Sequence, residues 1–537
     1  MNQLPLIDAQ SRLIECDDPL ILTTGGPGSG KTHAAMLLAK RLIEAEPADS
    51  GRVVLFLTFS RAATRELLTR MPTVVPASLR DRLEINTFHG YARRILDSYG
   101  RYAGRGLEPL TIASRTEQKL GLAPAGSIIM DQLVPEAVAL LERSPWILER
   151  MSGRLIAVIS DEYQDTGDPQ DRLLTLLASR SRLLCLADGD QMIYDFLPGV
   201  NSRRLVTLRA RRPTEITLEA RSHRDPSGVI PRIARAIHDR RFDDAVFAEA
   251  RAAGRLRIQT DVDPLYESVV AEVRELRMTG HKSVGVFVSQ RFMVEELGRE
   301  LSEVGIAHEI AGLDDAAGEA ETVIAAMAMY ATGQGDWDDV CARMAVFLAA
   351  SQAKHQVPTV CERLINNREE LSVALQNGLD ALKRDLEGLD GQPINGLFEK
   401  ADGFMLRFTW GKRLWSIGSR DLAGQAAAIV REPLSPERAQ LLDAIARRRH
   451  GDSSLDEILA QPLPVRLMTT FQAKGREMDA IVLVHHPEDI MKNNEHEKLS
   501  RVHFVALSRA RQTVSIMLCP NPQLFVAPYG GLGETWF

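Results

Sequence analysis

The chain has 537 residues, of which 45% are hydrophobic and 26% are charged, and its formal net charge is -7. Because this length exceeds what one hydrophobic core fills, several globular domains are expected. The negative net charge excludes a protein that coats DNA through a uniformly basic surface. A protein with this net charge can still bind nucleic acid through local basic grooves. The five cysteines are scattered singly, which argues against structural zinc, an iron–sulfur cluster and a disulfide framework.

The sequence carries no signal for export or membrane insertion. Its first residues lack the basic start and small-residue cleavage site of a signal peptide. No apolar run reaches the length of about eighteen residues that a transmembrane helix needs. We therefore expect a cytoplasmic protein without a membrane partner.

From about residue 19 to 212, short apolar runs alternate with stretches of helical spacing. Runs such as 53–57, 155–159 and 183–186 suit strands that are buried on both faces. They predict a parallel sheet covered by helices, hence an α/β fold. The stretch 100–150 has helical spacing but no such run, and we interpret it as a helical insertion.

A second alternating region follows and includes the apolar run 283–288. Helix formers then dominate 316–460, which we interpret as a second inserted domain, before the alternation resumes. The predicted organisation is a first sheet domain (1–99 and 151–212) around the insertion 100–150, and a second sheet domain (213–315 and 461–537) around the insertion 316–460.

The first motif that carries chemistry directly follows the apolar run Leu20–Leu22 and fits the phosphate-loop pattern G-x-x-x-x-G-K-[ST]. In such a loop the glycines let backbone N–H groups wrap phosphates, Lys31 reaches the β- and γ-phosphates, and the Thr32 hydroxyl ligates Mg²⁺. A chance glycine turn is the alternative, but the apolar run before and the helical stretch after favour a nucleotide site. Its expected residues are Gly25, Gly26, Pro27, Gly28, Ser29, Gly30, Lys31 and Thr32.

The second motif, Asp161-Glu-Tyr-Gln-Asp165, follows another apolar run. A carboxylate at the end of a buried strand, Asp161, is placed to hold Mg²⁺ through water. The adjacent Glu162 can orient or deprotonate the attacking water. The alternative is a pair of acids at the start of a helix, which the upstream phosphate loop disfavours.

This second motif resembles the D-E-[FY]-Q-D motif of the UvrD/Rep/PcrA group of superfamily 1A DNA helicases. The other motifs follow in the family's order, so the resemblance spans nearly the whole chain. It implies two RecA-like parallel-sheet motor domains, each with a mainly helical inserted subdomain. It also implies an ATP-dependent translocase or helicase that moves 3′-to-5′ on single-stranded DNA, with ATP and Mg²⁺ as cofactors.

Three upstream segments resemble further motifs of this family. Gln10 resembles its adenine-reading glutamine, and Leu57–Ala63 resembles its T-F-[TS]-x-x-A-A motif. Thr87–Gly90 matches the T-F-H-[GS] element, which touches single-stranded DNA in the family. The resemblance thus implies DNA contacts at Phe59, Thr87 and His89.

The segment Ala187–Tyr194 resembles the family's G-D-x-x-Q-x-I-Y motif, with alanine where glycine is usual. The resemblance implies that Gln191 senses the γ-phosphate and that Tyr194 and Phe196 stack on DNA bases. Such stacking suits a translocase because every base presents a π-face, so no sequence is required. Ordinary core packing is the alternative role for these two aromatic residues.

Residues 218–224 resemble the motif L-x-x-N-Y-R. His223 stands in place of the adenine-stacking tyrosine, and Arg224 corresponds to the phosphate-contacting arginine. The alignment needs one extra residue, so Arg221 remains a rival for that role.

Residues 469–477 resemble T-x-H-x-x-K-G-L-E but depart from it at Phe471 and Arg476. The resemblance implies that Gly475 and Glu477 lie at the nucleotide, with Glu477 on the ribose, and that Thr469 lies at the DNA. Phe471 leaves the polar contact of the family's histidine in doubt.

Residues 505–511 resemble V-A-x-[TS]-R-A-[RK], whose first arginine, here Arg509, reaches the γ-phosphate from the facing domain. A solvent-exposed helix arginine is the alternative. If Arg224 and Arg509 contact phosphate only in a closed state, hydrolysis reopens the cleft between the motor domains. The expected catalytic set is Lys31, Asp161, Glu162, Gln191, Arg224 and Arg509.

Two alternative functions stay open. One is a nucleotide-gated DNA-sensing subunit of a larger complex that does not unwind processively, and the other is an RNA-directed motor. Because only a short sequence follows Arg511, we expect this chain to lack the nuclease activity of larger family members. The chain also resembles the helicase-like subunits of two-component phage-defence systems such as Gabija, which implies a separate nuclease partner alongside single-stranded or duplex DNA.

Overall fold

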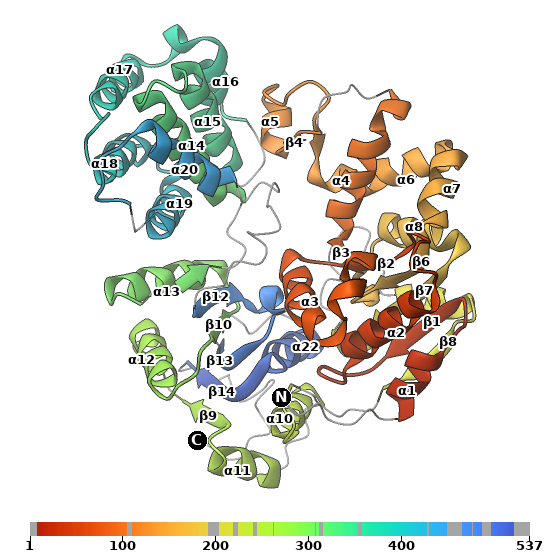
Figure 1. The fold of residues 1–537 in the computed structure, drawn as a ribbon. Helices are drawn as coiled ribbons and strands as arrows, with labels where there is room; N and C mark the ends of the chain where they lie inside the picture. Colours follow the sequence, from red (N-terminus) through yellow and green to blue (C-terminus); the bar gives the residue numbers. More distant parts are fainter. Residues whose placement is uncertain are drawn as a thin grey trace. The chain divides into compact units, whose positions relative to one another are not determined.

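The computed structural model describes residues 8–104, 110–191, 203–218, 224–239, 244–260, 262–306, 308–310, 315–352, 357–426, 429–447, 464–474, 476–485 and 496–519. The chain divides into two units. Unit 1 comprises Met1–Gly104, Leu133–Gly312 and Ile458–Phe537, and unit 2 comprises Arg105–Gln132 and Leu313–Glu457. Unit 1 holds two parallel sheets, whereas unit 2 is mainly helical (Figure 1).

The first sheet of unit 1 has six parallel strands in the order β3-β2-β6-β7-β1-β8. They are β1 (Leu20–Thr24), β2 (Val53–Thr58), β3 (Leu83–Thr87), β6 (Leu155–Ser160), β7 (Arg182–Ala187) and β8 (Thr214–Thr217). Every residue of β2 and β6 is buried, as expected for central strands covered on both faces. The predicted parallel sheet is therefore confirmed.

The carboxyl ends of these strands lie at one edge of the sheet because the strands are parallel. Helices precede, connect and follow the strands. They are α1 (Asp8–Glu15), α2 (Lys31–Ala45), α3 (Arg61–Val74), α4 (Phe88–Tyr99), α6 (Leu133–Arg143), α7 (Pro145–Gly153), α8 (Asp168–Leu177) and α9 (Arg204–Ala210). Short 3-10 turns, η4 (Tyr163–Asp165) and η6 (Gly189–Gln191), follow β6 and β7. The predicted motifs lie at this carboxyl-terminal edge of the sheet.

The strand β8 corrects the predicted start of the second sheet domain at residue 213. It pairs in parallel with β1, and Ile216 and Leu218 are buried in the core of the first sheet. Arg212, with φ at 55°, lies in the turn between α9 and β8 rather than at a domain boundary. The boundary was placed too early because an edge strand with polar residues lacks the apolar run used to recognise the others.

The predicted insertion 100–150 is divided between the two units. Its second half forms α6 and α7, and α6 buries Leu133, Val134 and Ala137 in unit 1. Its first half joins unit 2 and contains α5 (Arg115–Lys119) and a small parallel pair, β4 (Ile112–Ala113) with β5 (Ile128–Ile129). These strands are too short to give a periodic signal, so the sequence indicated helix alone.

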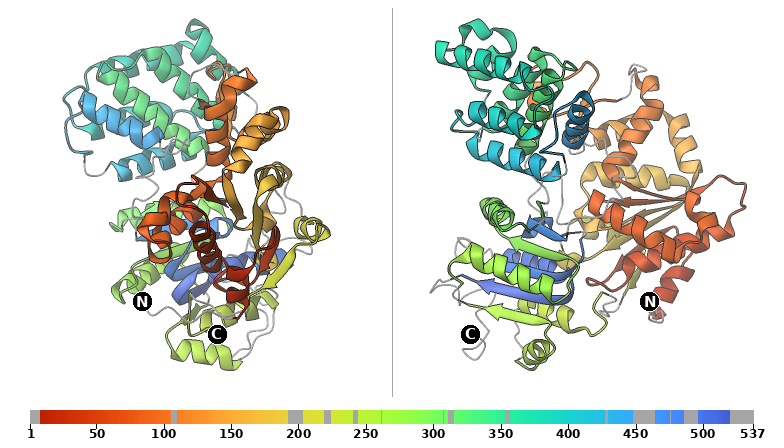
Figure 2. Two further views of the ribbon diagram at one scale, coloured as in Figure 1. Left: turned by 45° about the vertical axis from the view of Figure 1, so that its right-hand side comes forward. Right: turned by 60° about the vertical axis from the view of Figure 1, so that its left-hand side comes forward.

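The second sheet of unit 1 also has six parallel strands, in the order β11-β12-β10-β13-β14-β9. They are β9 (Leu256–Gln259), β10 (Val284–Val288), β11 (His308–Ile310), β12 (Val465–Thr469), β13 (Met478–His485) and β14 (Ala510–Leu518). Strands from the green and blue parts of the chain lie side by side in it (Figure 2). The long insertion between β11 and β12 therefore leaves the sheet intact.

The two faces of the second sheet bury separate apolar clusters. Along β13, Ile481 and Leu483 point to one cluster while Val482 and Val484 point to the other, as strand alternation requires. The covering helices are α10 (Val229–Asp239), α11 (Asp244–Ala252) and α22 (His496–Leu507) on one face, and α12 (Leu265–Met278) and α13 (Arg291–Glu303) on the other.

Unit 2 is an all-helical core with α5, β4 and β5 attached. Its helices are α14 (Asp315–Ala331), α15 (Trp337–Ala350), α16 (Thr359–Asn366), α17 (Val373–Glu387), α18 (Ile394–Met405), α19 (Lys412–Gln425) and α20 (Pro436–Arg447). A Cβ on Gly418 of α19 would lie 2.1 Å from the Ala317 oxygen of α14, so glycine is needed for these helices to approach. Arg343 of α15 pairs with Glu117 of α5 at 2.8 Å.

Within the described ranges, no helix combines the length and apolar character that crossing a lipid bilayer would require.

Candidate active site

The loop between β1 and α2 has the backbone of a phosphate loop. Gly28 and Gly30 have φ values of 76° and 85°, in the left-handed region that favours glycine. A Cβ on Gly25 would lie 2.7 Å from Ser29 Oγ and 3.1 Å from the Leu218 oxygen. The loop is therefore tightly wound, and α2 begins at Lys31 immediately after it.

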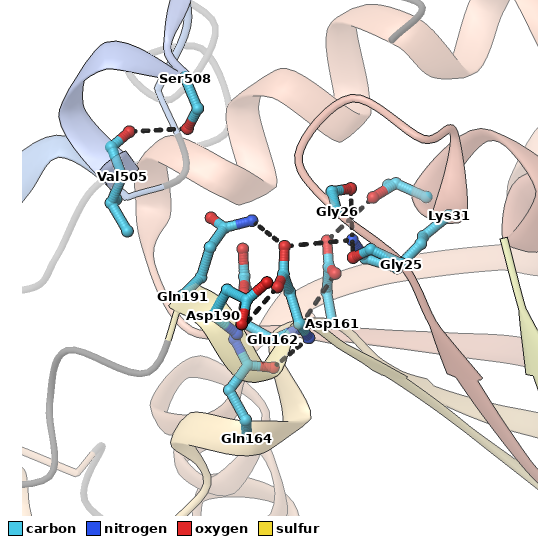
Figure 3. A network of polar contacts seen from close by, with 12 residues as sticks. Gly25, Gly26, Lys31, Asp161, Glu162, Gln164, Asp190, Gln191, Val505 and Ser508 are labelled. Atoms are coloured by element: carbon cyan, nitrogen blue, oxygen red, sulfur yellow. Dashed lines mark hydrogen bonds and ion pairs between the residues drawn. The ribbon is translucent and has the colours of Figure 1, made fainter. Parts of the chain in front are cut away.

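Two side chains hold the phosphate loop in position through hydrogen bonds to its backbone oxygens. Lys31 Nζ donates hydrogen bonds to the Gly25 oxygen at 2.6 Å and the Gly26 oxygen at 3.1 Å, and lies 3.9 Å from Asp188 (Figure 3). Gln10, fully buried on α1, donates to the Ser29 oxygen at 3.1 Å. Among the described residues, the buried Ser29 hydroxyl has no hydrogen-bond partner, so the loop retains a polar group that a phosphate fits.

The oxygen atoms of Thr32 and Asp161 lie together at the start of α2 and the end of β6. Thr32 Oγ1 donates to Asp161 Oδ2 at 3.3 Å, and the Glu162 N–H donates to Asp161 Oδ1 at 3.0 Å. Burial, reinforced by Glu162, raises the pKa of Asp161 to about 6. A hydroxyl beside a carboxylate is a donor set that suits Mg²⁺, so these residues fit the predicted metal position.

Glu162 occupies a strained position beside a lysine from the second sheet domain. Its φ is 50°, which is unusual for a residue with a side chain. Its carboxylate accepts a hydrogen bond from Gln164 at 2.5 Å and lies 3.8 Å from Lys474 Nζ. Burial opposes its ionisation, but Lys474, Arg509 and Lys31 outweigh burial and lower its pKa. Glu162 is thus held as a carboxylate, the form a general base needs.

Lys474 also binds Asp165, the last residue of the second motif. Its ammonium group donates to Asp165 Oδ2, and both side chains are buried. Burial raises the pKa of Asp165 to about 7 even though Lys474 acts in the opposite direction. Lys474 thereby connects the segment after β12 with two carboxylates that follow β6.

The polar residues after β7 connect to the second sheet domain through Arg509. Gln191 donates to Asp188 Oδ2 at 2.5 Å, and Asp188 N–H donates to Gln164 at 3.0 Å. Figure 3 shows Gln191 and Gln164 grouped with Asp161 and Glu162, with Val505 and Ser508 beyond them. Arg509 is buried and donates to the side-chain oxygen of Gln191. The expected γ-phosphate sensor and the expected arginine finger are therefore in contact.

A second cluster gathers three arginines around Glu477. Arg224 donates to Glu477 Oε1 at 2.8 and 2.5 Å and to the Ser508 oxygen at 2.7 Å. Arg511 lies 2.9 Å from Glu477 Oε2, and Arg70 of α3 lies 2.7 Å from Oε1. Burial would raise the pKa of Glu477, but Arg224, Arg70 and Arg511 hold it well below its usual value.

A cavity of about 390 Å³ lies beside the phosphate loop. Gly26 and Pro27 of the loop, Arg224, Phe504, Ser508 and several residues of α10 line it. Arg235 of α10 stacks on the Phe504 ring at 5.0 Å and pairs with Asp190 at 2.7 Å. The predicted nucleotide-binding residues therefore border a space that both sheet domains enclose.

The expected DNA-binding residues lie at other strand ends and make local contacts. Phe59, after β2, packs edge-on against Phe88 at 6.4 Å between ring centroids. Thr87, at the end of β3, accepts a hydrogen bond from the Gly90 N–H and caps α4, whose first turn carries His89. Thr469 ends β12, and its N–H donates to Gln472 at 2.8 Å. Tyr194, Phe196, His223, Gly475 and the rival Arg221 lie outside the described residues.

The structure adds two residues that sequence reasoning missed, Arg70 and Glu66. They form an i,i+4 ion pair on α3, a spacing visible in the sequence but common on any solvated helix. What marks them is contact with Glu477, which no local pattern shows. Burial and the charge of Glu477 raise the pKa of Glu66 to about 7.

The N-terminal part of the chain matches a known family model. Residues 6–129 and 125–205 match the model described as the UvrD/REP helicase N-terminal domain. This region contains the phosphate loop, the second motif and most of the first sheet.

Individual relatives, which share one name, match the chain over longer stretches. The ATP-dependent DNA helicase PcrA of Leuconostoc citreum is 22% identical over 343 residues, or 52% of this chain and 45% of the relative. PcrA of Staphylococcus aureus is 27% identical over 247 residues, or 34% of this chain and 33% of the relative. PcrA of Bacillus subtilis is 27% identical over 256 residues, which is 36% of this chain and 34% of the relative.

The chain spans less than half the length of these curated relatives. The family model, the PcrA relatives and the two parallel sheets that meet at a phosphate loop nevertheless agree. The chain is therefore similar to UvrD/PcrA helicases, and its two parallel sheets are consistent with a pair of RecA-like domains.

Proposed function

We propose that this chain is an ATP-dependent motor that moves 3′-to-5′ along single-stranded DNA and unwinds duplex DNA. The observation that carries the proposal is that Arg509 and Lys474 of the second sheet domain contact Gln191, Asp165 and Glu162 beside the phosphate loop. Nucleotide chemistry at this junction would act on both sheet domains at once. The similarity to proteins named ATP-dependent DNA helicase supports DNA as the substrate.

In the proposed cycle, phosphate oxygens of ATP replace the protein oxygens that accept hydrogen bonds from basic side chains in this structure. Lys31 exchanges the Gly25 and Gly26 oxygens for phosphate oxygens, while the loop N–H groups bind the phosphates. Thr32 and Asp161 would hold Mg²⁺, which neutralises charge on the phosphates when bound. Glu162 orients the attacking water and accepts its proton.

Coupling follows from the partners of the two motor arginines. Arg509 now binds Gln191, and Arg224 now binds Glu477. A γ-phosphate is a stronger hydrogen-bond acceptor for the two arginines than their present partners. When hydrolysis removes it, the arginines return to their protein partners. The closed arrangement of the sheet domains is therefore most stable with triphosphate, which makes the DNA grip of the two domains alternate.

The proposed DNA track follows the strand ends that carry Phe59, Thr87 and His89 in the first sheet domain and Thr469 in the second. Tyr194 and Phe196 are the proposed stacking residues. Stacking contributes about 1–3 kcal/mol per base and is independent of sequence, which suits a motor.

ATP hydrolysis measured with no nucleic acid, single-stranded DNA, duplex DNA and RNA tests this proposal. We expect single-stranded DNA to stimulate turnover strongly, and duplexes with a 3′ tail to be unwound in preference to those with a 5′ tail. The Phe196→Ala variant should lose DNA stimulation but keep basal turnover, whereas Lys31→Ala should lose both. Hydrolysis that no nucleic acid stimulates at any salt concentration would contradict the motor.

The second candidate is a nucleotide-gated DNA-sensing subunit, and two results would replace the motor with it. These are DNA-stimulated hydrolysis without strand displacement, and recovery of unwinding or cleavage only with a nuclease partner. Co-purification of the chain with tagged partners distinguishes a subunit from an independent motor. A cytoplasmic location stays a prediction.

A further inference from the structure

An aromatic cluster lies on the surface of unit 1, at the end of α4 farthest from the first sheet. It consists of Tyr99, Tyr102 and Trp146, and we name it the α4-end patch. The Trp146 ring lies 4.9 Å from Tyr102 and 6.1 Å from Tyr99, edge-on in both cases. Tyr102 is 52% exposed and Trp146 is 48% exposed, so the patch presents aromatic rings to solvent.

The patch does not serve the core of the helices that carry it. On α4 the buried side chains are Phe88, Tyr91, Ala92, Ile95 and Leu96, and on α7 the buried apolar side chains are Ile147 and Met151. Trp146 precedes Ile147 at the start of α7 and points away from that core. Grouped exposed aromatic rings are uncommon on a surface unless something binds them.

A guanidinium group completes the patch. Arg101 stacks over the Tyr102 ring at 4.8 Å and donates to the Tyr102 hydroxyl at 2.8 Å. Among the described residues, no carboxylate pairs with Arg101. A cation held flat beside exposed rings offers a base a stacking face and a phosphate a counter-charge, which is the combination that single-strand binding surfaces use.

The place of the patch in the fold points to one ligand. The same helix, α4, begins at Thr87 and His89, two residues of the proposed DNA track, and ends at Tyr99. The twelve residues of α4 (Figure 1) span about 18 Å, so its two ends lie one helix length apart. The two ends of α4 thus carry the proposed track residues and the patch, and α6 packs along the helix between them.

We propose that the α4-end patch is a second DNA-binding site, which stacks bases of the strand flanking the motor track. The inference rests on the proposed function, since it assigns a further contact to the same DNA. Trp146 and Tyr102 supply the stacking faces, and Arg101 supplies the phosphate contact. The patch lengthens the bound segment and holds the strand while the track releases it.

Binding and hydrolysis measured with oligothymidines of two lengths test the site. One of about 8 nucleotides fills only the track, whereas one of about 30 reaches the patch. We expect Trp146→Ala, combined with Tyr102→Ala, to weaken binding of the long oligonucleotide about 10-fold by fluorescence anisotropy. Hydrolysis stimulated by the short oligonucleotide should stay at the level of the unaltered protein.

Matched variants separate stacking from general damage. Trp146→Phe keeps an aromatic face and should retain most of the long-oligonucleotide affinity, whereas Arg101→Gln should reduce the salt dependence of binding. Trp410→Ala removes the other exposed tryptophan among the described residues and should change nothing. Thermal unfolding of each variant checks that the fold is kept.

The outcomes are distinguishable. Unchanged long-oligonucleotide affinity in the double variant, or an equal loss in Trp410→Ala, overturns the patch while leaving the motor intact. Patch variants that keep DNA affinity but lose a co-purifying protein would assign the patch to a protein partner instead. Absence of any DNA stimulation in the unaltered protein overturns the proposed function and the patch together.

Discussion

Arg509, in the turn between α22 and β14, donates a hydrogen bond to Gln191 across 318 residues of sequence. Each residue comes from a different sheet domain, and both are buried. A buried guanidinium whose pKa is lowered by burial is costly unless an acceptor faces it. Gln191 supplies that acceptor and holds Arg509 beside the polar residues that follow β7.

We expect Arg509→Lys to lower DNA-stimulated ATP turnover about 10³-fold, because a lysine keeps the charge but loses the planar fork that contacts phosphate. Steady-state hydrolysis with saturating single-stranded DNA measures the effect. Arg274→Ala, at an exposed position on α12, is the control and should retain full turnover. Turnover of Arg509→Lys close to that of the control would show that Arg509 does not reach the reacting phosphate.

Lys31→Ala should lower ATP hydrolysis by at least about 10²-fold, since the ammonium group is the side-chain cation that the phosphate loop itself supplies. Release of phosphate, measured with and without DNA, checks this. The matched control is Lys40→Ala, further along α2, whose ammonium group pairs with the exposed Glu44 at 3.8 Å. Equal activity of the two variants would be incompatible with the assigned nucleotide site.

Glu477→Gln should destabilise the nucleotide-free protein by about 3 kcal/mol, because it leaves Arg224, Arg70 and Arg511 around a neutral group. A lowered midpoint of thermal unfolding would report this. Glu215→Gln breaks an exposed pair with Arg209 and should cost less than about 1 kcal/mol. A midpoint no lower than that of Glu215→Gln would mean that the three arginines find other partners.

Glu66 makes the stability of the protein pH-dependent. Its pKa of about 7 lies above the ordinary value of 4.5, so the folded state binds more protons than the unfolded state between these values. The stability that protonated Glu66 contributes is complete below about pH 4.5 and is lost as the pH rises through about 7.

Glu66→Gln mimics the protonated form, so we expect its unfolding midpoint to exceed that of the unaltered protein by more at pH 8 than at pH 5. Thermal unfolding across this range, without nucleotide, gives the difference at each pH. Glu149→Gln, which alters an exposed pair with Arg180, should show no such trend. A difference that shrinks with rising pH would contradict the raised pKa.

The sequence predicted the parts of the fold that depend on local patterns. Buried parallel strands such as β2 and β6 are continuous apolar runs, and the phosphate loop is a contiguous motif, so both were recognisable. The edge strand β8 was assigned to the wrong domain because one of its faces is polar and its pairing with β1 is not local.

The candidate site was predictable to the extent that its residues lie within motifs. Lys474 and Asp165 stand inside two of them, yet their pairing depends on how the two sheet domains meet. Arg70 and Glu66 lie outside the quoted motifs, and only burial against Glu477 distinguishes them from other helix ion pairs. Long-range electrostatic partners therefore remained beyond sequence reasoning.

The strand β8 has a mechanical consequence for the proposed motor. The Leu218 N–H donates to the Thr24 oxygen at 2.7 Å, and the hydroxyls of Thr24 and Thr217 lie 3.0 Å apart. Gly25, the first residue of the phosphate loop, follows Thr24 directly. Under the proposed cycle, a shift of the loop would therefore reach Leu218 through this main-chain hydrogen bond. Side-chain scanning would leave this linkage untouched, whereas a backbone ester in place of the Leu218 amide would sever it.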